Sequence, residues 1–219
     1  MRFILKTARE QEMEKAARFG FVDGIVIPRN ETERTGRQYD SLVRSSLNYP
    51  FPIIGLELRE LSAERLAKEV EAYHKLDTQR ITALFPMTLA SLSAMNRLKS
   101  SGVQLGIQHA VTVIQLLAAE RAGSDVLHIS MRPFRNFGLD IIGTVLALQA
   151  HLRKRESGCA IWIEDAITAK EANEMAALGA DALVLTWDML QDFMYHPATD
   201  QEIERMLTSW TREESSDRS

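Results

Sequence analysis

Three charged residues stand where a short apolar run ends, and this placement suits acid–base chemistry. Lys6 follows the run RFIL, Glu57 lies in IIGLEL, and Asp165 follows AIWIE. The carboxyl ends of parallel strands meet at one face of a barrel, where enzymes of this architecture carry their active sites. A desolvated lysine has a lowered pKa and can act as a nucleophile or a base. With Glu57 and Asp165 beside it, Lys6 could transfer protons through one raised and one ordinary carboxyl pKa.

The same three residues also have a structural interpretation. Lysines commonly reach solvent or pair with an acid, and Asp165 can cap a helix that begins near Thr168. Alternation along a strand turns Glu164 away from Asp165. The cluster of Lys6, Glu57 and Asp165 is therefore either catalytic or a buried salt-bridge network, and the residues alone favour neither.

Further polar residues are expected at the same ends of strands. Gln108 ends the fifth apolar run, and His109 after it is either an acid–base group or a polar residue at a helix start. His128 lies inside a strand and is expected to be packed. Arginines at a barrel mouth bind phosphate or carboxylate groups, although each one alone can be a solvated loop charge. The candidate substrate or phosphate ligands are Arg29, Ser130, Arg132 and Arg135.

Eight apolar runs alternate with longer helical patterns, which predicts an α/β fold. Most of the runs are continuously apolar, as in parallel strands covered on both faces. The expected strands are Arg2–Leu5, Gly24–Ile27, Pro52–Glu57, Ile81–Leu84, Val103–Ile107, Val126–Ser130, Ala160–Glu164 and Ala182–Leu185.

A weak internal repeat supports a barrel. AARFGFVDGIVI, AAERAGSDVLHI and AALGADALVLT each pass from a small-residue helix end through a glycine and an acid into an apolar strand. Glycine suits the left-handed cap of the helix, and the short turn lets the strand pack back at once. A (β/α)8 TIM barrel is predicted. An open doubly wound sheet is the second choice, but no GxGxxG follows a strand. The polar stretch PRNETERTGRQYD is expected to be a long loop.

The chain after the eighth strand predicts an extra C-terminal helix. Residues 1–197 are assigned to the barrel, 198–213 to this helix, with Thr199 or Asp200 as its cap, and 214–219 to a frayed tail. The helix carries an apolar stripe that suits either its own barrel or a neighbouring subunit. The stripe consists of Ile203, Met206, Leu207 and Trp210.

Composition limits the class of protein. The chain has 219 residues, a net charge of −4 and one cysteine, which indicates no nucleic-acid partner and fits a reducing cytoplasm. No apolar run is long enough to span a bilayer, so no membrane partner is expected. No spacing of His, Cys, Asp and Glu predicts a metal site, and no cofactor is expected.

Nearly the whole chain resembles the transaldolase family, in particular its small fructose-6-phosphate aldolase-like branch. The resemblance lies in the order and spacing of MRFILKTAREQEMEKAARFGFVDGIVIP, LSAERLAKEVEAY, FPMTLASLSAMNRLKSSGV, QLLAAERAGSDVL and the closing segment from ALVLTWDML to RMLTSW. It implies a (β/α)8 barrel that works on a small carbonyl or sugar-phosphate substrate. It also implies a ring of subunits, a pentamer or a decamer, whose C-terminal helices reach a neighbour.

The motifs that carry the family's chemistry are changed here. The family's Schiff-base lysine on the fourth strand corresponds to Leu84. Its first-strand aspartate corresponds to Lys6, and its third-strand glutamate or glutamine to Glu57. The second-strand asparagine, fifth-strand threonine, sixth-strand aromatic and phosphate-binding arginine and serine correspond to Pro28, Gln108, Ser130, Pro133 and Asp165.

Three functions fit these changes. In the first, Lys6 replaces the lost lysine as the Schiff-base amine of a class I aldolase or transaldolase. In the second, Lys6, Glu57 and Asp165 carry out acid–base chemistry without a Schiff base, as in an isomerase or lyase. In the third, the protein is catalytically silent and binds a metabolite or serves assembly, and a site filled by paired charges would favour it.

Overall fold

The computed structural model describes residues 1–34, 36 and 38–216. For residues 33, 34 and 210–216 it describes the backbone but not the side chains. Two compact units are present, Met1–Trp187 and Asp188–Ser219. The boundary expected at residue 197, between barrel and C-terminal helix, stays a prediction. No helix among the described residues combines the length and hydropathy needed to cross a bilayer.

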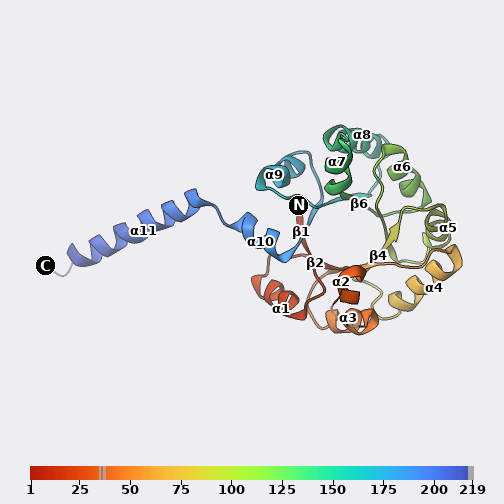
Figure 1. The fold of residues 1–219 in the computed structure, drawn as a ribbon, viewed down its shortest axis with the longest axis horizontal. Helices are drawn as coiled ribbons and strands as arrows, with labels where there is room; N and C mark the ends of the chain where they lie inside the picture. The colour runs from red at the N-terminus through yellow and green to blue at the C-terminus, as the bar shows by residue number, and fades with distance from the viewer. Residues whose placement is uncertain (35, 37, 217–219) are drawn as a thin grey trace. The chain divides into compact units, whose positions relative to one another are not determined.

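The first unit is a closed parallel barrel (Figure 1), which confirms the predicted (β/α)8 fold. Neighbouring strands in the chain are neighbours in the barrel, and β8 closes it by pairing with β1. Each predicted strand is found within two residues of its expected ends. The strands are β1 Arg2–Lys6, β2 Gly24–Ile27, β3 Ile53–Glu57, β4 Ile81–Pro86, β5 Gln104–Gln108, β6 Val126–Ser130, β7 Ala160–Glu164 and β8 Ala182–Leu185.

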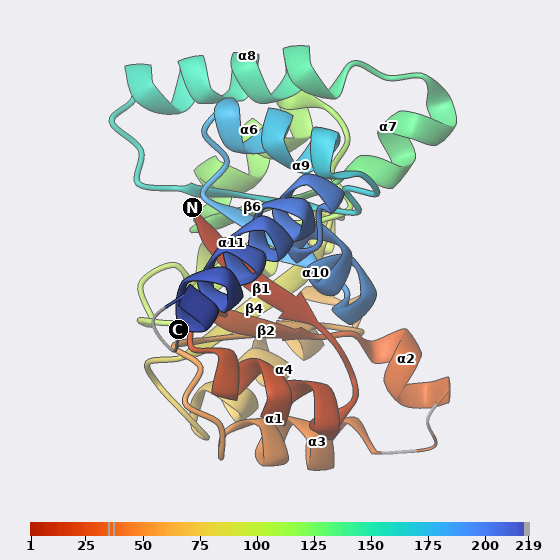
Figure 2. The same ribbon diagram turned by 90° about the vertical axis from the view of Figure 1, so that its left-hand side faces the viewer.

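Helices surround the barrel and cover the outer faces of its strands (Figure 1). In the view turned by 90°, α6, α8 and α9 lie on one side of the strands and α1, α3 and α4 on the other (Figure 2). The helices of the first unit are α1 Glu10–Phe19, α2 Arg29–Arg34, α3 Tyr39–Ser46, α4 Ala63–His74, α5 Leu89–Leu98, α6 Val113–Ala122, α7 Met131–Phe137, α8 Ile141–Lys154 and α9 Ala169–Ala177. α2 was not expected, because its polar sequence RNETER has no apolar period.

The glycine–acid–strand repeat has a structural cause at the amino-terminal ends of the strands. Gly20, Gly123 and Gly179 follow helices and have φ values of 72°, 106° and 85°, in the left-handed region that suits glycine. The acids of the three copies each accept a hydrogen bond from a backbone N–H near the start of the preceding strand. Asp23 accepts from Phe3 at 2.8 Å, Asp125 from Leu105 at 2.8 Å, and Asp181 from Ile161 at 2.7 Å. Each copy thus ties one strand to the next.

The barrel interior is apolar through its middle. Leu84 is completely buried in this core. A Cβ added to Gly106 would lie 2.7 Å from Leu84 Cδ2, and one added to Gly55 would lie 3.3 Å from Leu84 Cδ1. The leucine therefore fills the space left by glycines on both neighbouring strands. The core cluster comprises Ile4, Val26, Ile53, Leu84, Val126, Trp162, Ala182 and Val184.

The second unit contains most of α10 (Trp187–Met194) and all of α11 (Pro197–Ser216). α11 begins at Pro197, before the predicted caps, because proline is well tolerated in the first turn of a helix. Three residues of the predicted stripe, Ile203, Met206 and Leu207, are between 42% and 49% exposed. The side chain of Trp210 and the predicted tail lie outside the described side chains.

Candidate active site

Lys6 lies at the carboxyl end of β1, between two carboxylates from other strands. Its Nζ is 2.8 Å from Glu57 Oε1 on β3 and 2.8 Å from Glu164 Oε1 on β7. The three residues are the last of their strands, so the parallel register brings them to the same end of the barrel. All three side chains are largely buried. The pair of Lys6 and Glu57 was predicted, whereas the second carboxylate is Glu164 rather than Asp165.

The two carboxylates reverse the direction of the pKa shift that was expected for Lys6. Burial alone would lower the pKa of Lys6, but the negative charges of Glu164 and Glu57 outweigh it and raise the pKa above its ordinary value. The prediction of a lowered lysine pKa is therefore wrong. Burial likewise opposes the charged form of Glu164, but His128 and Lys6 outweigh it and hold the pKa of this carboxyl well below its usual range. Both groups carry their charges at neutral pH.

His128 extends this cluster into the barrel. It is almost fully buried on β6, and its Nε2 lies 2.9 Å from Glu164 Oε2, without the geometry of a standard hydrogen bond. Its ring meets Trp162 edge-on, at 6.2 Å between ring centroids. Neither His128 Nδ1 nor Trp162 Nε1 has a hydrogen-bond partner among the described residues. Such polar atoms are costly inside a core and often mark a functional site.

Arg29 contacts Glu57 through both its backbone and its side chain. The Arg29 backbone N–H donates to Glu57 Oε2 at 3.1 Å, and its Nε donates to the Glu57 carbonyl at 2.8 Å. Its guanidinium also pairs with Glu69 and lies 4.0 Å from the centre of the Tyr39 ring. These contacts hold Arg29 at the end of β3, and its role as a phosphate ligand stays a prediction.

Asp165 lies apart from the Lys6 pairs, beside Ser130 and Arg132. Its Oδ2 accepts a hydrogen bond from Ser130 Oγ at 2.5 Å, and its Oδ1 pairs with Arg132 Nη2 at 2.6 Å. Its backbone carbonyl accepts a bond from Arg135 Nη2 at 2.9 Å, and Arg135 also pairs with Glu171 at 3.2 Å. The predicted anion ligands are therefore brought together, but this chain's own acids occupy them.

Two other polar residues lie at the end of β5 and directly after it. Gln108 is buried, and its amide nitrogen lies 3.5 Å from the carbonyl of Leu84. His109 follows with φ of 66°, a left-handed conformation that is uncommon for a residue with a side chain. Burial lowers the pKa of His109, the charge of Glu57 opposes that shift, and His128 and Lys6 add to it. The pKa of His109 therefore depends on the charges of the nearby cluster as well as on burial.

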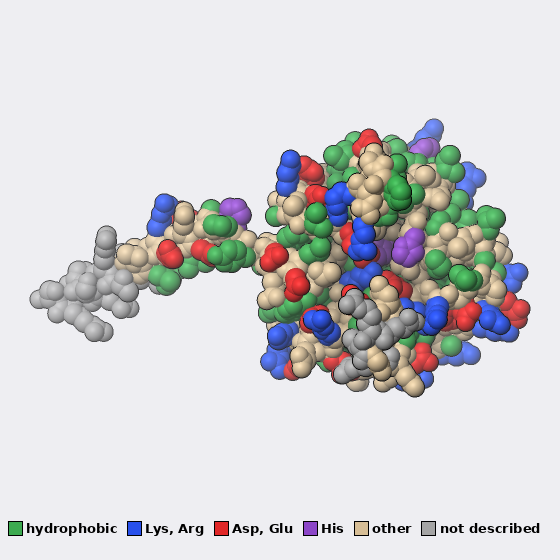
Figure 3. All heavy atoms as spheres, viewed as in Figure 1, with side chains coloured by type: hydrophobic (Ala, Val, Ile, Leu, Met, Phe, Trp, Pro, Cys, Tyr) green, Lys and Arg blue, Asp and Glu red, His purple; other side chains and the backbone are tan. Residues whose placement is uncertain are grey.

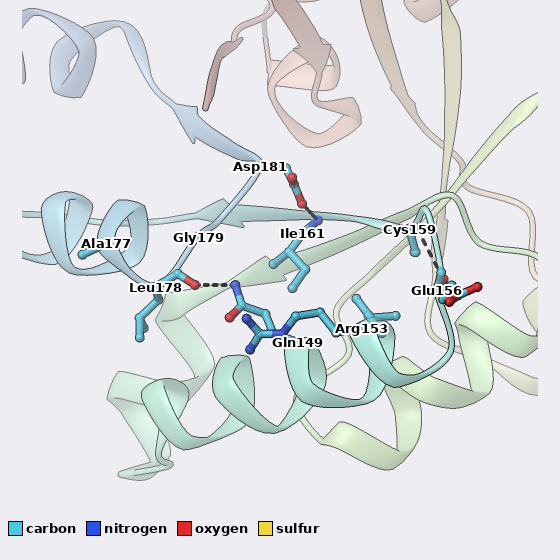
Figure 4. A pocket seen from close by; sticks show the side chains of 11 residues that line it. Gln149, Arg153, Glu156, Cys159, Ile161, Ala177, Leu178, Gly179 and Asp181 are labelled. Carbon is cyan, nitrogen blue, oxygen red and sulfur yellow. Dashed lines mark hydrogen bonds between the residues drawn. The ribbon is translucent and has the colours of Figure 1, made fainter.

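Basic, acidic and histidine side chains gather over the centre of the barrel in a view along its axis (Figure 3). A separate pocket of about 690 Å³ lies between the end of α8 and the end of α9 (Figure 4). It lies near the amino-terminal end of β7, whereas Glu164 is at the carboxyl end of that strand. Cys159 in this pocket has its pKa raised to about 12, mainly by burial, so its thiol is a poor nucleophile. We therefore place the candidate active site at the Lys6 end.

Glu164 and His128 were missed as site residues. A signal for Glu164 was present, because RFILK, IIGLE and AIWIE are apolar runs that all end in a charge. No comparable local signal identifies His128, since histidine inside a strand is often only packed. No group of three His, Cys, Asp or Glu that could hold a metal ion occurs within the described part of the chain.

The fold and site define a (β/α)8 barrel with a charged cluster at the carboxyl ends of its strands, and comparisons with known proteins find similar proteins. A protein of Aquifex aeolicus named probable transaldolase is 26% identical over 216 residues, covering 97% of each chain. Proteins of the same name from Kosmotoga olearia and Methanococcus maripaludis are 24% and 23% identical, over at least 96% of each chain. No family model matches the chain. Similarity at this level over nearly the full length supports a transaldolase-like family.

Proposed function

We propose that this protein is an acid–base enzyme on a transaldolase-like barrel and acts on a small carbonyl compound of the sugar or sugar-phosphate class. The observation that carries the proposal is the 2.8 Å distance from Lys6 Nζ to both Glu57 and Glu164. A lysine in this position stays protonated and can donate a hydrogen bond to a carbonyl oxygen. That bond stabilises the enolate that forms when a base removes a proton from the adjacent carbon.

The two carboxylates have different roles in this proposal. Glu164 is held between Lys6 and His128, and its lowered pKa makes it a weak base that keeps Lys6 charged. The second oxygen of Glu57 accepts a hydrogen bond from the fixed backbone N–H of Arg29, which orients the carboxylate. We assign Glu57 as the base that removes the proton from carbon, and Lys6 as the group that polarises the carbonyl.

A relocated Schiff base is the second candidate. It is supported by the inward position of Lys6 at the end of β1 and by Leu84 in place of the family's lysine. A nucleophilic amine must be neutral, however, and the raised pKa of Lys6 opposes this. Substrate binding would have to separate Lys6 from its carboxylates before attack.

A catalytically silent protein is the third candidate, and the complete pairing of Lys6 favours it. Against it stands the cost of the cluster, because apolar residues of similar volume stabilise a core at least as well as buried ion pairs. Trp162 Nε1 and His128 Nδ1, which have no hydrogen-bond partner within the described part of the chain, add to that cost. A purely structural core has no need of these groups.

Proton exchange with solvent separates the three candidates. The protein is incubated in D2O with dihydroxyacetone, dihydroxyacetone phosphate or fructose 6-phosphate, and loss of the proton next to the carbonyl is followed by NMR. A second sample is treated with borohydride in the presence of each compound, desalted and assayed again, with peptide mapping for an adduct. Acid–base catalysis gives exchange that survives borohydride and is lost in Glu57→Gln. A Schiff base gives an adduct on Lys6 and loss of exchange, and a silent protein gives no exchange with any of the three compounds.

We also propose a cytoplasmic homo-oligomer, a pentamer or decamer, held partly by α11. The support is the exposure of Ile203, Met206 and Leu207 on one helical stripe. An apolar stripe of this spacing suits a groove on a second copy of the chain.

A further inference from the structure

The groups best suited to bind an anion at the barrel mouth are held by one carboxylate of the chain itself. Asp165 receives the Ser130 hydroxyl at 2.5 Å and the Arg132 guanidinium at 2.6 Å on its two carboxylate oxygens. A hydroxyl and a guanidinium that converge in this way are typical ligands of a phosphate or carboxylate group. We infer that Asp165 is a built-in anion that excludes phosphorylated compounds, so that the site takes an unphosphorylated carbonyl substrate; this inference rests on the proposed function.

Burial makes Asp165 difficult to displace. The side chain of Asp165 is 13% exposed, whereas that of Arg132 is 67% exposed. A phosphate that approached Arg132 could therefore reach the outer side of the guanidinium, but the Ser130 hydroxyl is already bonded to the carboxylate. Two negative groups within a few ångströms of each other repel strongly where water is partly excluded.

The surrounding charges do not compensate for this repulsion. Arg135 is bound to Glu171 and to the carbonyl of Asp165, and Arg29 is bound to Glu69 and Glu57. The paired groups that extend from the cluster to these arginines include one more carboxylate than ammonium and guanidinium groups. They are Lys6, Arg29, Arg132 and Arg135 against Glu57, Glu69, Glu164, Asp165 and Glu171. A phosphate dianion would raise this excess, while a neutral sugar or ketone would not.

The backbone of Asp165 allows a direct test. Its φ is 64°, a left-handed conformation that glycine adopts without strain and asparagine tolerates. Asp165→Gly removes the carboxylate and leaves Ser130 and Arg132 free to bind another anion. Asp165→Asn is the matched control, because it keeps the shape but removes the charge.

Binding of inorganic phosphate is measured by calorimetry on the full-length wild type and on both variants. Since the freed hydroxyl and guanidinium can each make a charge-assisted hydrogen bond to the anion, we expect Asp165→Gly to bind phosphate at least about tenfold more tightly than the wild type. Asp165→Asn should bind with intermediate affinity, and adding Arg132→Gln to Asp165→Gly should abolish the gain. Equal affinity in the wild type and Asp165→Gly would overturn the inference. So would tight phosphate binding to the wild type that Arg132→Gln removes, a result that needs no Asp165 variant to fold.

The exchange assay supplies a second measurement. The wild type should exchange protons of dihydroxyacetone faster than those of dihydroxyacetone phosphate at equal concentration, and Asp165→Gly should shift the preference toward the phosphate. Faster exchange of the phosphate by the wild type would contradict the inference while leaving acid–base catalysis intact. Absence of exchange with every compound would contradict the proposed function, while the binding measurements would still decide whether Asp165 excludes phosphate.

Discussion

Removing the ammonium of Lys6 should destabilise the protein in a way that depends on pH. Lys6→Met keeps the length of the side chain but leaves Glu57 and Glu164 facing each other with their shared cation gone. Each carboxylate side chain is only 13% exposed. Breaking a buried ion pair by removing one partner costs about 3–5 kcal/mol, and the residual exposure places this case near 3 kcal/mol. For a chain of this length such a loss lowers the Tm by roughly 6–12 °C.

The sign of the pH effect follows from the pKa of Glu164. In the wild type this pKa is lowered by folding, so the carboxylate stabilises the native state above its unfolded pKa and the stabilisation is lost as pH falls. In Lys6→Met the carboxylates destabilise the native state while charged, and protonation relieves them. The gap in stability between the two proteins should therefore be widest at pH 7 and should narrow toward about pH 4, near the ordinary pKa of glutamate.

Urea unfolding followed by circular dichroism at both pH values measures this gap. Lys68→Met is the matched control, because Lys68 pairs with Glu64 on an exposed helix surface and its loss should leave stability unchanged. The triple variant Lys6→Met, Glu57→Gln and Glu164→Gln should recover part of the loss, since no unpaired charge remains. A gap of the same size at pH 7 and pH 4 would show that Lys6 contributes packing rather than charge, and the reasoning would be wrong.

Three further predictions concern the core and the assembly. Leu84→Lys should not give aldolase activity on fructose 6-phosphate, because the resemblance to transaldolases places Lys6 where that family has its first-strand aspartate, so the new amine would lack this carboxylate as a proton-transfer partner; clear cleavage in a coupled assay would refute this. Gly106→Ala should lose about 1–3 kcal/mol in urea unfolding, because its Cβ would lie 2.7 Å from Leu84 Cδ2. The loss should be smaller when it is measured in a Leu84→Ala background, and an equal loss there would point to another cause. Truncation before Thr199 should lower the molecular mass in light scattering to that of a smaller assembly; if truncated and intact proteins keep the same number of subunits, α11 does not hold the oligomer.

The sequence determined the barrel because the signals for its elements are local. Eight apolar runs that alternate with helical patterns were enough to place all eight strands. The three repeats of glycine, acid and strand predicted short connections, since a left-handed glycine must end the helix before the strand can begin. The functions of their acids came from the structure: Asp23, Asp125 and Asp181 bond to strands that lie about twenty residues earlier in the chain.

Part of the candidate site was also determined by the sequence. Lys6 and Glu57 end strands that were predicted correctly, so their meeting at one end of the barrel follows from a parallel register. Leu84 lies inside a predicted apolar strand, and the structure buries it against Gly55 and Gly106. The catalytic roles of Lys6 and Glu57 stay predictions.

Only the tertiary structure decided which acid meets Lys6. The alternation of side chains along a strand predicts that Glu164 and Asp165 face opposite sides, but the sequence does not show which of them faces the barrel axis. Glu164 is still in β7 and points inward, whereas Asp165 has left the strand with a left-handed φ and turns toward Ser130 and Arg132. The pKa of Lys6 depends on that choice, because two carboxylates, each 2.8 Å from its Nζ, together outweigh the effect of burial that a sequence pattern can predict.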